Sequence, residues 1–467
     1  MTQRIVILGG GPAGYEAALV AAELGADVSI VADEGLGGNS VLWDCVPSKA
    51  LIVASEAMGW LSMAQSMGVG SGSENGSDHV SVDLARVNAS VLELGSSQSR
   101  DIERRVIGAG VDVVRGRGRF QGSHEVVVDL KEGGQQVLSA DYALIATGSQ
   151  ARVLDFFEPD GDRVLIGQQV YGLSSLPEHL IVVGSGATGA EFANAFRRFG
   201  SQVTLVSSRD LILPTEDPDA AQVIEEVFER RGMTILRNAR AVSCERQGDG
   251  VRVGLQDGSE VVGSHALFTV GQIPTSAELG LDTCGIDIDE RGAIPVDSVG
   301  RTSARWVYAA GDVTGRMMLA SVAAMQGRTA MWHALGQAVQ PIRWDSVAAT
   351  VFTDPEVATV GRTVTEATEA GMPVETARLE FRNNPRAKMI HGFDGFVKVH
   401  ALTGSGTVVG AVVVSPRASD LIQPLAVAVQ NRLTVAQLAQ TITVYPSMAG
   451  SIAECARMLM VRLDNPH

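Results

Sequence analysis

The feature of this sequence that most constrains its fold is a strand, glycine-turn and helix pattern that occurs twice. In the first copy, the apolar run Arg4-Ile5-Val6-Ile7-Leu8 leads into Gly9-Gly10-Gly11-Pro12-Ala13-Gly14 and a helix pattern. In the second, Leu180-Ile181-Val182-Val183 leads into Gly184-Ser185-Gly186-Ala187-Thr188-Gly189 and another helix pattern. A further apolar segment follows each helix, at residues 28–31 and 203–206. The chain is therefore expected to contain two βαβ units, each built on a parallel sheet.

Each glycine turn stands where a dinucleotide can be held. The turn amides and the positive end of the helix dipole attract a pyrophosphate, and glycines let the backbone approach it closely. One such turn could be a tight turn without a ligand, but two copies suit an enzyme that brings two dinucleotides together. The expected cofactor contacts are Gly9, Gly11, Pro12, Ala13 and Gly14 in the first turn and Gly184, Gly186 and Gly189 in the second.

The residues after the second strand of each unit indicate which dinucleotide is bound. A carboxylate at this place binds ribose hydroxyls, and we expect Asp33 to do so in the first unit. The second unit has Ser207-Ser208-Arg209, with no carboxylate to repel a 2′-phosphate and an arginine that can pair with it. NADPH is therefore favoured over NADH, with Ser207 and Arg209 as contacts, unless Arg209 is only a solvated surface residue.

Length, charge and cysteine spacing exclude several classes of protein. A chain of 467 residues exceeds what one hydrophobic core serves, so several domains are expected. The net charge of −16 argues against a nucleic-acid partner. No apolar run approaches the roughly 20 residues that span a bilayer, and no signal-peptide pattern is found, so a cytoplasmic protein without stable membrane insertion is expected. The four cysteines lack metal-ligand spacing, so no metal site is expected.

Further elements are predicted outside the two units. Residues 68–78 are rich in glycine and serine and are expected to form a surface loop, followed by a helix over about 83–109. From about residue 344, strands at 397–400 and 408–414 alternate with helices near 416–431 and 451–462. This last region is expected to be a third domain of a different architecture.

Motifs along nearly the whole chain resemble the pyridine nucleotide-disulfide oxidoreductases, a family that includes lipoamide dehydrogenase and glutathione reductase. Their order and spacing are collectively very specific. The motifs that carry the resemblance, besides the two glycine turns, are Gly37-Gly38, Pro47-Ser48-Lys49, Ala146-Thr147-Gly148, Val270-Gly271-Gln272-Ile273-Pro274, Ala310-Gly311-Asp312, Phe352-Thr353-Asp354-Pro355-Glu356 and Tyr445-Pro446-Ser447.

The resemblance implies an α/β protein with two Rossmann-like dinucleotide-binding domains and a C-terminal α+β dimerisation domain. FAD would be bound by residues 1–149 and 276–343 and NAD(P)H by residues 150–275. Residues 344–467 would form a homodimer or a dimer of dimers.

The resemblance also implies roles for single residues. Asp312 would contact the FAD ribityl chain. Lys49, paired with Glu191, would lie by the flavin N5, where an ammonium stabilises the negative charge of a reduced flavin; a purely structural salt bridge is the alternative. Further implied cofactor contacts are Thr147, Gly148, Gly271, Gly311, Leu319 and Ala320.

The sequence departs from the disulfide-reducing members of this family at three positions. Their cysteine pair corresponds here to Ser40 and Cys45. Their His-Pro motif and the glutamate four residues after its proline correspond here to Tyr445 and Gly450. A serine cannot form a disulfide, and the proton shuttle of the thiol pair is missing as well. Dithiol exchange with lipoamide or glutathione is therefore expected to be absent.

The roles of Cys45 and Cys455 leave alternatives open. Cys45 could be a single redox-active cysteine, as in coenzyme A disulfide reductases and peroxide-reducing members, or a small buried residue packed under the flavin. Cys455, nine residues after Pro446, could replace the missing thiol.

The residues expected around the flavin favour a quinone as the electron acceptor. Trp43, Tyr445 and Met448 would give the vacated face an aromatic and apolar lining, which suits a flat quinone, although ordinary interface packing is the alternative. We therefore expect an NAD(P)H quinone reductase that uses FAD, with Lys49, Glu191, Cys45 and Tyr445 as its catalytic residues. The soluble pyridine nucleotide transhydrogenase, which also has a tryptophan at the position of Trp43, is the enzymatic alternative. A redox-silent FAD-binding scaffold is the non-enzymatic one.

Overall fold

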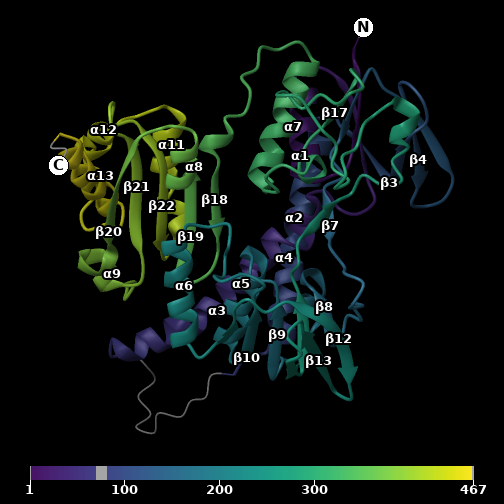
Figure 1. Cartoon of the computed structure of the whole chain (residues 1–467). Helices are drawn as coiled ribbons and strands as arrows, with labels where there is room; N and C mark the ends of the chain where they lie inside the picture. The colour runs from purple at the N-terminus through teal and green to yellow at the C-terminus, as the bar shows by residue number, and fades with distance from the viewer. Residues whose placement is uncertain (1, 70–80, 465–467) are drawn as a thin grey trace.

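The computed structural model describes residues 2–69 and 81–464, which form three regions (Figure 1). The loop expected at residues 68–78 falls largely outside the described residues. In the described part of the chain, no helix is long and apolar enough to cross a membrane.

The first glycine turn follows the carboxyl end of β1, an inner strand of a seven-stranded sheet with the strand order β17-β6-β1-β2-β3-β4-β5. The pairs from β17 to β3 are parallel, and β4 and β5 continue the sheet in antiparallel fashion. Because parallel strands end at the same edge, Gly9, Ala146 and Ala310, which follow β1, β6 and β17, meet there. The strands are β1 (Arg4–Leu8), β2 (Asp27–Ala32), β3 (Asp112–Phe120), β4 (Glu125–Leu130), β5 (Gln135–Ser139), β6 (Tyr142–Ile145) and β17 (Val307–Ala309).

Helices α1 (Pro12–Glu23) and α7 (Ala320–Ala334) pack against each other beside this sheet. Their backbones come very close, because a Cβ atom on Gly327 of α7 would lie 2.1 Å from the carbonyl oxygen of Ala13. This close packing directs the N-termini of both helices to the sheet edge that carries the first glycine turn.

The second glycine turn belongs to a separate parallel sheet with the order β11-β10-β9-β15-β8. Helices α5 (Ala187–Phe199) and α6 (Pro218–Arg230) accompany it, and an antiparallel sheet of β12, β13 and β14 lies beside it (Figure 1). The strands are β8 (Val164–Ile166), β9 (His179–Val183), β10 (Gln202–Val206), β11 (Thr234–Leu236), β12 (Ala241–Gln247), β13 (Gly250–Leu255), β14 (Glu260–Gly263) and β15 (His265–Phe268).

The C-terminal region is an antiparallel sheet of order β18-β19-β22-β21-β20, covered by helices. The expectation of one helix near residues 416–431 is wrong: α10 (Ala418–Leu421) and α11 (Gln423–Gln430) are separate. Pro424 explains the break, because proline has no amide hydrogen and is accommodated only in the first turn of a helix, where α11 places it. The remaining elements here are β18 (Ala348–Val351), β19 (Glu356–Gly361), β20 (Val374–Glu380), β21 (Phe396–Leu402), β22 (Val408–Ser415), α8 (Val364–Glu369), α9 (Pro385–Met389), α12 (Val435–Gln440) and α13 (Gly450–Asp464).

One hydrophobic cluster joins all three regions. It contains Leu51 from α3 (Cys45–Ser66), Phe196 from α5 and Val351 and Phe396 from the C-terminal sheet. Helix α3 lies between the regions in Figure 1 and packs against α5 and α4 (Leu84–Gly108). The start of α3 is therefore held in a fixed place relative to both glycine turns. The shorter elements near this junction are α2 (Gly38–Leu42), β7 (Ser149–Ala151) and β16 (Gln272–Pro274).

Candidate active site

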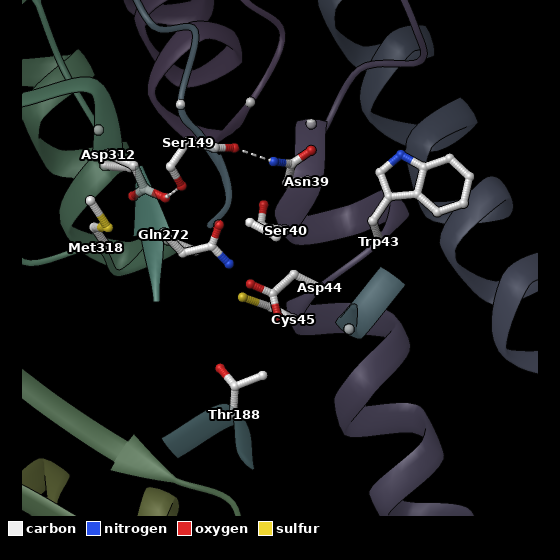
Figure 2. Close-up of a pocket in the computed structure, with 18 of the residues that line it drawn as sticks. Asn39, Ser40, Trp43, Asp44, Cys45, Ser149, Thr188, Gln272, Asp312 and Met318 are labelled. Carbon is white, nitrogen blue, oxygen red and sulfur yellow. Dashed lines mark hydrogen bonds between the residues drawn. The ribbon is translucent and has the colours of Figure 1, made fainter. Parts of the chain in front are cut away.

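A cavity of about 550 Å³ opens between the two glycine turns. The turn after β1 and the ends of β6 and β17 form one wall, and residues 186–188 and 268–272 of the second unit form the other. Helix α2 and the start of α3 add Asn39, Ser40, Asp44 and Cys45, and Thr188 lies across from Cys45 (Figure 2). Residues from both expected dinucleotide sites therefore line one cavity.

The first glycine turn has the geometry that a bound pyrophosphate needs. Gly9 has φ +109°, which favours glycine. A Cβ atom on Gly14 would lie 1.9 Å from the Gly9 carbonyl oxygen, so only glycine lets helix α1 pack on the turn. A Cβ atom on Gly11 would meet nothing within 4 Å, so Gly11 faces open space. The second turn repeats these three environments at Gly184, Gly189 and Gly186.

A hydrogen-bond chain crosses the cavity wall at Asp312. The Ser149 hydroxyl donates to Asp312 Oδ2 at 2.7 Å, and Asn39 Nδ2 donates to the Ser149 carbonyl at 2.7 Å (Figure 2). Burial raises the pKa of Asp312, and the Ser149 hydrogen bond opposes this rise. The Thr147 hydroxyl donates to the Thr275 carbonyl at 2.6 Å, which fixes the neighbouring loop.

The other residues implied by the resemblance as cofactor contacts fall around this wall. Gly148, Gly271, Gly311 and Ala320 line the cavity, and Ala320 is the first residue of α7. Leu319 is the N-cap residue of α7 and is not among the described residues that line the cavity.

Lys49 and Glu191 form an ion pair where the three regions meet. Lys49 Nζ donates to Glu191 Oε2 at 2.8 Å, and the amide of Phe352 donates to Glu191 Oε1 at 2.9 Å. The Lys49 ammonium also lies 5.0 Å from the centre of the Phe352 ring, within cation–π range. Burial lowers the pKa of Lys49, but the Glu191 carboxylate raises it more, so the net shift is upward. The ammonium therefore stays charged one turn after Cys45.

Ser40 and Cys45, which the resemblance matches to the cysteine pair of the disulfide-reducing members, both line the cavity. The Ser40 hydroxyl donates to the Gly37 carbonyl at 3.0 Å. Cys45 is the first residue of α3, and its sulfur points into the cavity (Figure 2). Burial, followed by the neighbouring Asp44 carboxylate, raises the pKa of Cys45 to about 11. The Cys45 side chain is therefore a neutral thiol near pH 7.

The cavity wall beside Cys45 also contains Asp44, which the sequence motifs did not single out, and Trp43, which they did. The Asp44 side chain lines the cavity beside Cys45 (Figure 2). Trp43 also lines this cavity; it donates its Nε1 hydrogen to Glu34 at 2.9 Å, and its ring is turned away from Cys45 (Figure 2). The signal for Asp44 was its position immediately before the only cysteine in this loop.

The residues expected to bind the two riboses have different environments. Asp33 follows β2, but its carboxylate accepts a hydrogen bond from Arg117 Nε at 2.7 Å and is not among the described cavity-lining residues. Ser207 is fully buried, and its oxygen lies 2.8 Å from Ser185 Oγ and accepts from the Arg209 amide, so it shapes the turn. The Arg209 side chain is exposed and makes no ion pair within the described residues.

Comparison with known proteins defines the family. A family model described as pyridine nucleotide-disulphide oxidoreductase matches residues 3–327. The model for the dimerisation domain of the same family matches residues 347–456. The chain belongs to the pyridine nucleotide-disulphide oxidoreductase family. As in other members, its cofactors are FAD and NAD(P)H, and its dimerisation domain supports a homodimer.

Several members of this family are similar over almost their whole length. A protein of Mycobacterium tuberculosis named NAD(P)H dehydrogenase (quinone) is 48% identical, with 99% of this chain and 95% of that protein covered. Dihydrolipoyl dehydrogenase 2 of Haloarcula marismortui is 35% identical, with 97% and 95% covered. The crystal structure of LpdA from Mycobacterium tuberculosis has a TM-score of 0.93 at 48% identity and covers 98% of this chain and 100% of that chain.

The C-terminal residues singled out by sequence analysis lie away from the cavity of their own chain. Tyr445 lies between α12 and α13 and is 82% exposed, so it is available to a second copy. Met448 packs in the C-terminal core and is not among the described residues that line the cavity of its own chain. The suggestion that Cys455 replaces the missing thiol is wrong: Cys455 is buried in the same core, where burial raises its pKa to about 12. Gly450 begins α13 and cannot hold a proton.

Proposed function

We propose that this family member is an NAD(P)H quinone reductase that passes a hydride from NAD(P)H through FAD directly to a quinone. The observation that carries the proposal is the pair Ser40 and Cys45: among the described residues lining the cavity there is one thiol, where a dithiol relay needs two. The name of the 48% identical mycobacterial relative supports a quinone as the acceptor.

The first turn and its cavity fit FAD. Gly11 leaves open space for a phosphate at the N-terminus of α1, and Asp312 offers a half-buried carboxylate that accepts one side-chain hydrogen bond, from Ser149, within the described residues. When bound here, FAD supplies the chemistry that accepts a hydride from one partner and delivers it to the other. The turn residues Gly9, Gly11, Pro12, Ala13 and Gly14 would hold the pyrophosphate, with Thr147, Gly148, Gly311, Leu319 and Ala320 around the rest of the molecule.

We further propose that Lys49 stabilises negative charge at the flavin and that Glu191 positions Lys49. The pair is well suited to this role because Glu191 is bound from both sides, by Lys49 Nζ and by the Phe352 amide. A preorganised ammonium needs no rearrangement when charge develops near it.

Arg209 supports a preference for NADPH. Its free guanidinium follows β10, where a 2′-phosphate of the nucleotide would lie, and Ser207 holds the turn that presents it. The second turn, through Gly184, Gly186 and Gly189, would hold the pyrophosphate of this nucleotide, and Gly271 would lie beside it.

We propose three domains, one for each cofactor and one for dimerisation. Residues 1–149 and 276–343 form the FAD-binding domain, residues 150–275 the NAD(P)-binding domain and residues 344–467 the dimerisation domain. Tyr445 of one copy would approach the cavity of the other. We propose a homodimer or a dimer of dimers that acts in the cytoplasm without a nucleic-acid partner.

The deciding experiment measures how the reduced flavin is reoxidised. The holoenzyme is reduced anaerobically with NADPH and mixed separately with a benzoquinone, thio-NAD, lipoamide and peroxide, while the flavin absorbance is followed. Rapid reoxidation by the benzoquinone is expected. Faster reoxidation by thio-NAD would identify a transhydrogenase, and faster reoxidation by peroxide would identify a single-cysteine reductase. Rapid reoxidation by lipoamide alone would refute the proposal. No flavin reduction by NADPH or NADH would identify a redox-silent scaffold.

A further inference from the structure

Reduction of a quinone requires a proton as well as a hydride, and few residues in the cavity can give one. The titratable side chains among the described lining residues are Asp44, Cys45 and Asp312. Cys45 holds its proton tightly, because burial raises its pKa to about 11. Asp312 already accepts a hydrogen bond from Ser149 and lies beside the ends of β6 and β17. Asp44 is the remaining group among the described residues with which this chain lines its own cavity.

The Asp44 side chain is placed unusually for its position. Asp44 is the N-cap residue of α3, where an aspartate normally accepts a hydrogen bond from an amide of the first helical turn. Its side chain makes no such bond, and its backbone angles of φ −121° and ψ −92° are not those of a typical cap. The carboxylate instead points into the cavity, beside the Cys45 sulfur and facing Gln272 (Figure 2).

The charged neighbours of Asp44 include the Asp312 carboxyl group, whose pKa the negative charge of Asp44 helps to raise after burial, the largest cause. Other charged or titratable groups near this end of α3 are Cys45, Lys49 with Glu191, and Tyr171, whose buried hydroxyl has no hydrogen-bond partner within the described residues.

From this geometry we infer that Asp44 is the general acid that protonates the quinone. The inference rests on the proposed quinone reductase function. In each turnover NAD(P)H loses a hydride, one quinone oxygen receives that hydride through FAD, and the other oxygen receives the proton of the Asp44 carboxyl group. The products are NAD(P)⁺, the hydroquinone and the Asp44 carboxylate, which regains a proton from solvent. Asp44 thus fills the proton-donating role for which Tyr445 and Gly450 provide no histidine and glutamate.

The test separates proton-requiring from proton-free acceptors. The holoenzyme and its Asp44→Asn variant are reduced with NADPH and mixed with benzoquinone, which takes up protons, or with ferricyanide, which takes electrons only. Asparagine also caps helices well, so the variant is expected to fold. Asp44→Asn should slow reoxidation of the flavin by benzoquinone about 100-fold, which is within the range of general acid catalysis. The rate of reoxidation by ferricyanide should stay within about twofold of the wild-type rate. Asp44→Glu should restore most of the rate, and the matched surface variant Asp101→Asn should behave as wild type.

A second readout does not depend on turnover. In the oxidised holoenzyme, the rate of Cys45 alkylation by iodoacetamide at pH 9 is measured by mass spectrometry. Removing the negative charge of Asp44 should raise this rate, because that charge opposes formation of the Cys45 thiolate. An unchanged rate would show that the carboxylate does not lie beside the thiol and would overturn the geometric basis.

The outcomes distinguish this inference from the proposed function. If wild type reacts rapidly with benzoquinone and Asp44→Asn does too, the inference fails and the function stands. If Asp44→Asn slows both acceptors equally, Asp44 acts on the flavin environment and not as a proton donor. If wild type reacts with ferricyanide but not with benzoquinone, the proposed function fails, and the inference fails with it.

Discussion

Lys49 Nζ lies 2.8 Å from Glu191 Oε2, and this ion pair joins two regions that are far apart in the sequence. Lys49 stands near the start of α3, whereas Glu191 stands on α5 of the second unit. The second oxygen of Glu191 accepts the amide hydrogen of Phe352, which precedes β19 of the C-terminal sheet. One buried carboxylate therefore connects all three regions.

Replacing Glu191 with glutamine should weaken both stability and flavin reduction. The amide keeps the shape of the side chain but removes the charge that keeps Lys49 protonated despite its burial. Loss of a hydrogen bond to a charged group costs about 2 kcal/mol of unfolding free energy, and flavin reduction by NADPH should slow roughly 10-fold or more. Chemical denaturation and stopped-flow absorbance measure the two effects. Unchanged flavin reduction together with lower stability would make the pair purely structural.

Replacing Gly14 with alanine should lower stability, whereas replacing Gly11 with alanine should weaken FAD binding. At Gly14 the new Cβ would collide with the Gly9 carbonyl, so the unfolding free energy should fall by about 1–3 kcal/mol. At Gly11 the new methyl group meets no protein atom, so the apoprotein should keep its stability but bind FAD more weakly. Thermal denaturation of the apoprotein and flavin titration separate the two. Equal FAD binding by wild type and the Gly11 variant would place the pyrophosphate elsewhere.

Replacing Arg209 with alanine should affect NADPH and not NADH. The guanidinium is free to pair with a 2′-phosphate, and one such charge-assisted contact is worth about 1.4 kcal/mol or more, which is roughly 10-fold in KM. Steady-state kinetics with both nucleotides measure the change. Arg291→Ala, at another exposed position, is the control. Equal effects on NADPH and NADH would remove Arg209 from 2′-phosphate recognition.

Alkylation of Cys45 should keep accelerating up to about pH 11, because burial raises its pKa to about 11 from an ordinary value of 9.0. The same shift has a consequence for stability. Above pH 9 the unfolded chain loses the thiol proton while the native state retains it, so this group lowers the unfolding free energy as the pH rises from 9 to 11. Iodoacetamide labelling across this pH range measures the thiol directly. A midpoint near pH 7 would instead indicate a redox-active thiolate.

The sequence by itself determined the two βαβ units, the family and the missing dithiol. The constraints on a glycine turn come from residues close in the chain. Gly9 adopts a positive φ, and Gly14 must be small because the helix packs on the turn within the same unit. Likewise, Ser40 cannot form a disulfide in any fold. These properties depend on residues close in the chain or on the chemistry of one side chain.

Only the tertiary structure decided what surrounds those residues. Sequence spacing could not show that Arg117 donates a hydrogen bond to the carboxylate of Asp33, that Ser207 is buried, or that Cys455 lies in the C-terminal core. Nor could it show that Asp44, at the start of α3, points its carboxylate into the cavity instead of capping the helix. Burial, ion pairing and side-chain direction arise from contacts between segments that are distant in sequence, and these contacts exist only once the three regions pack together.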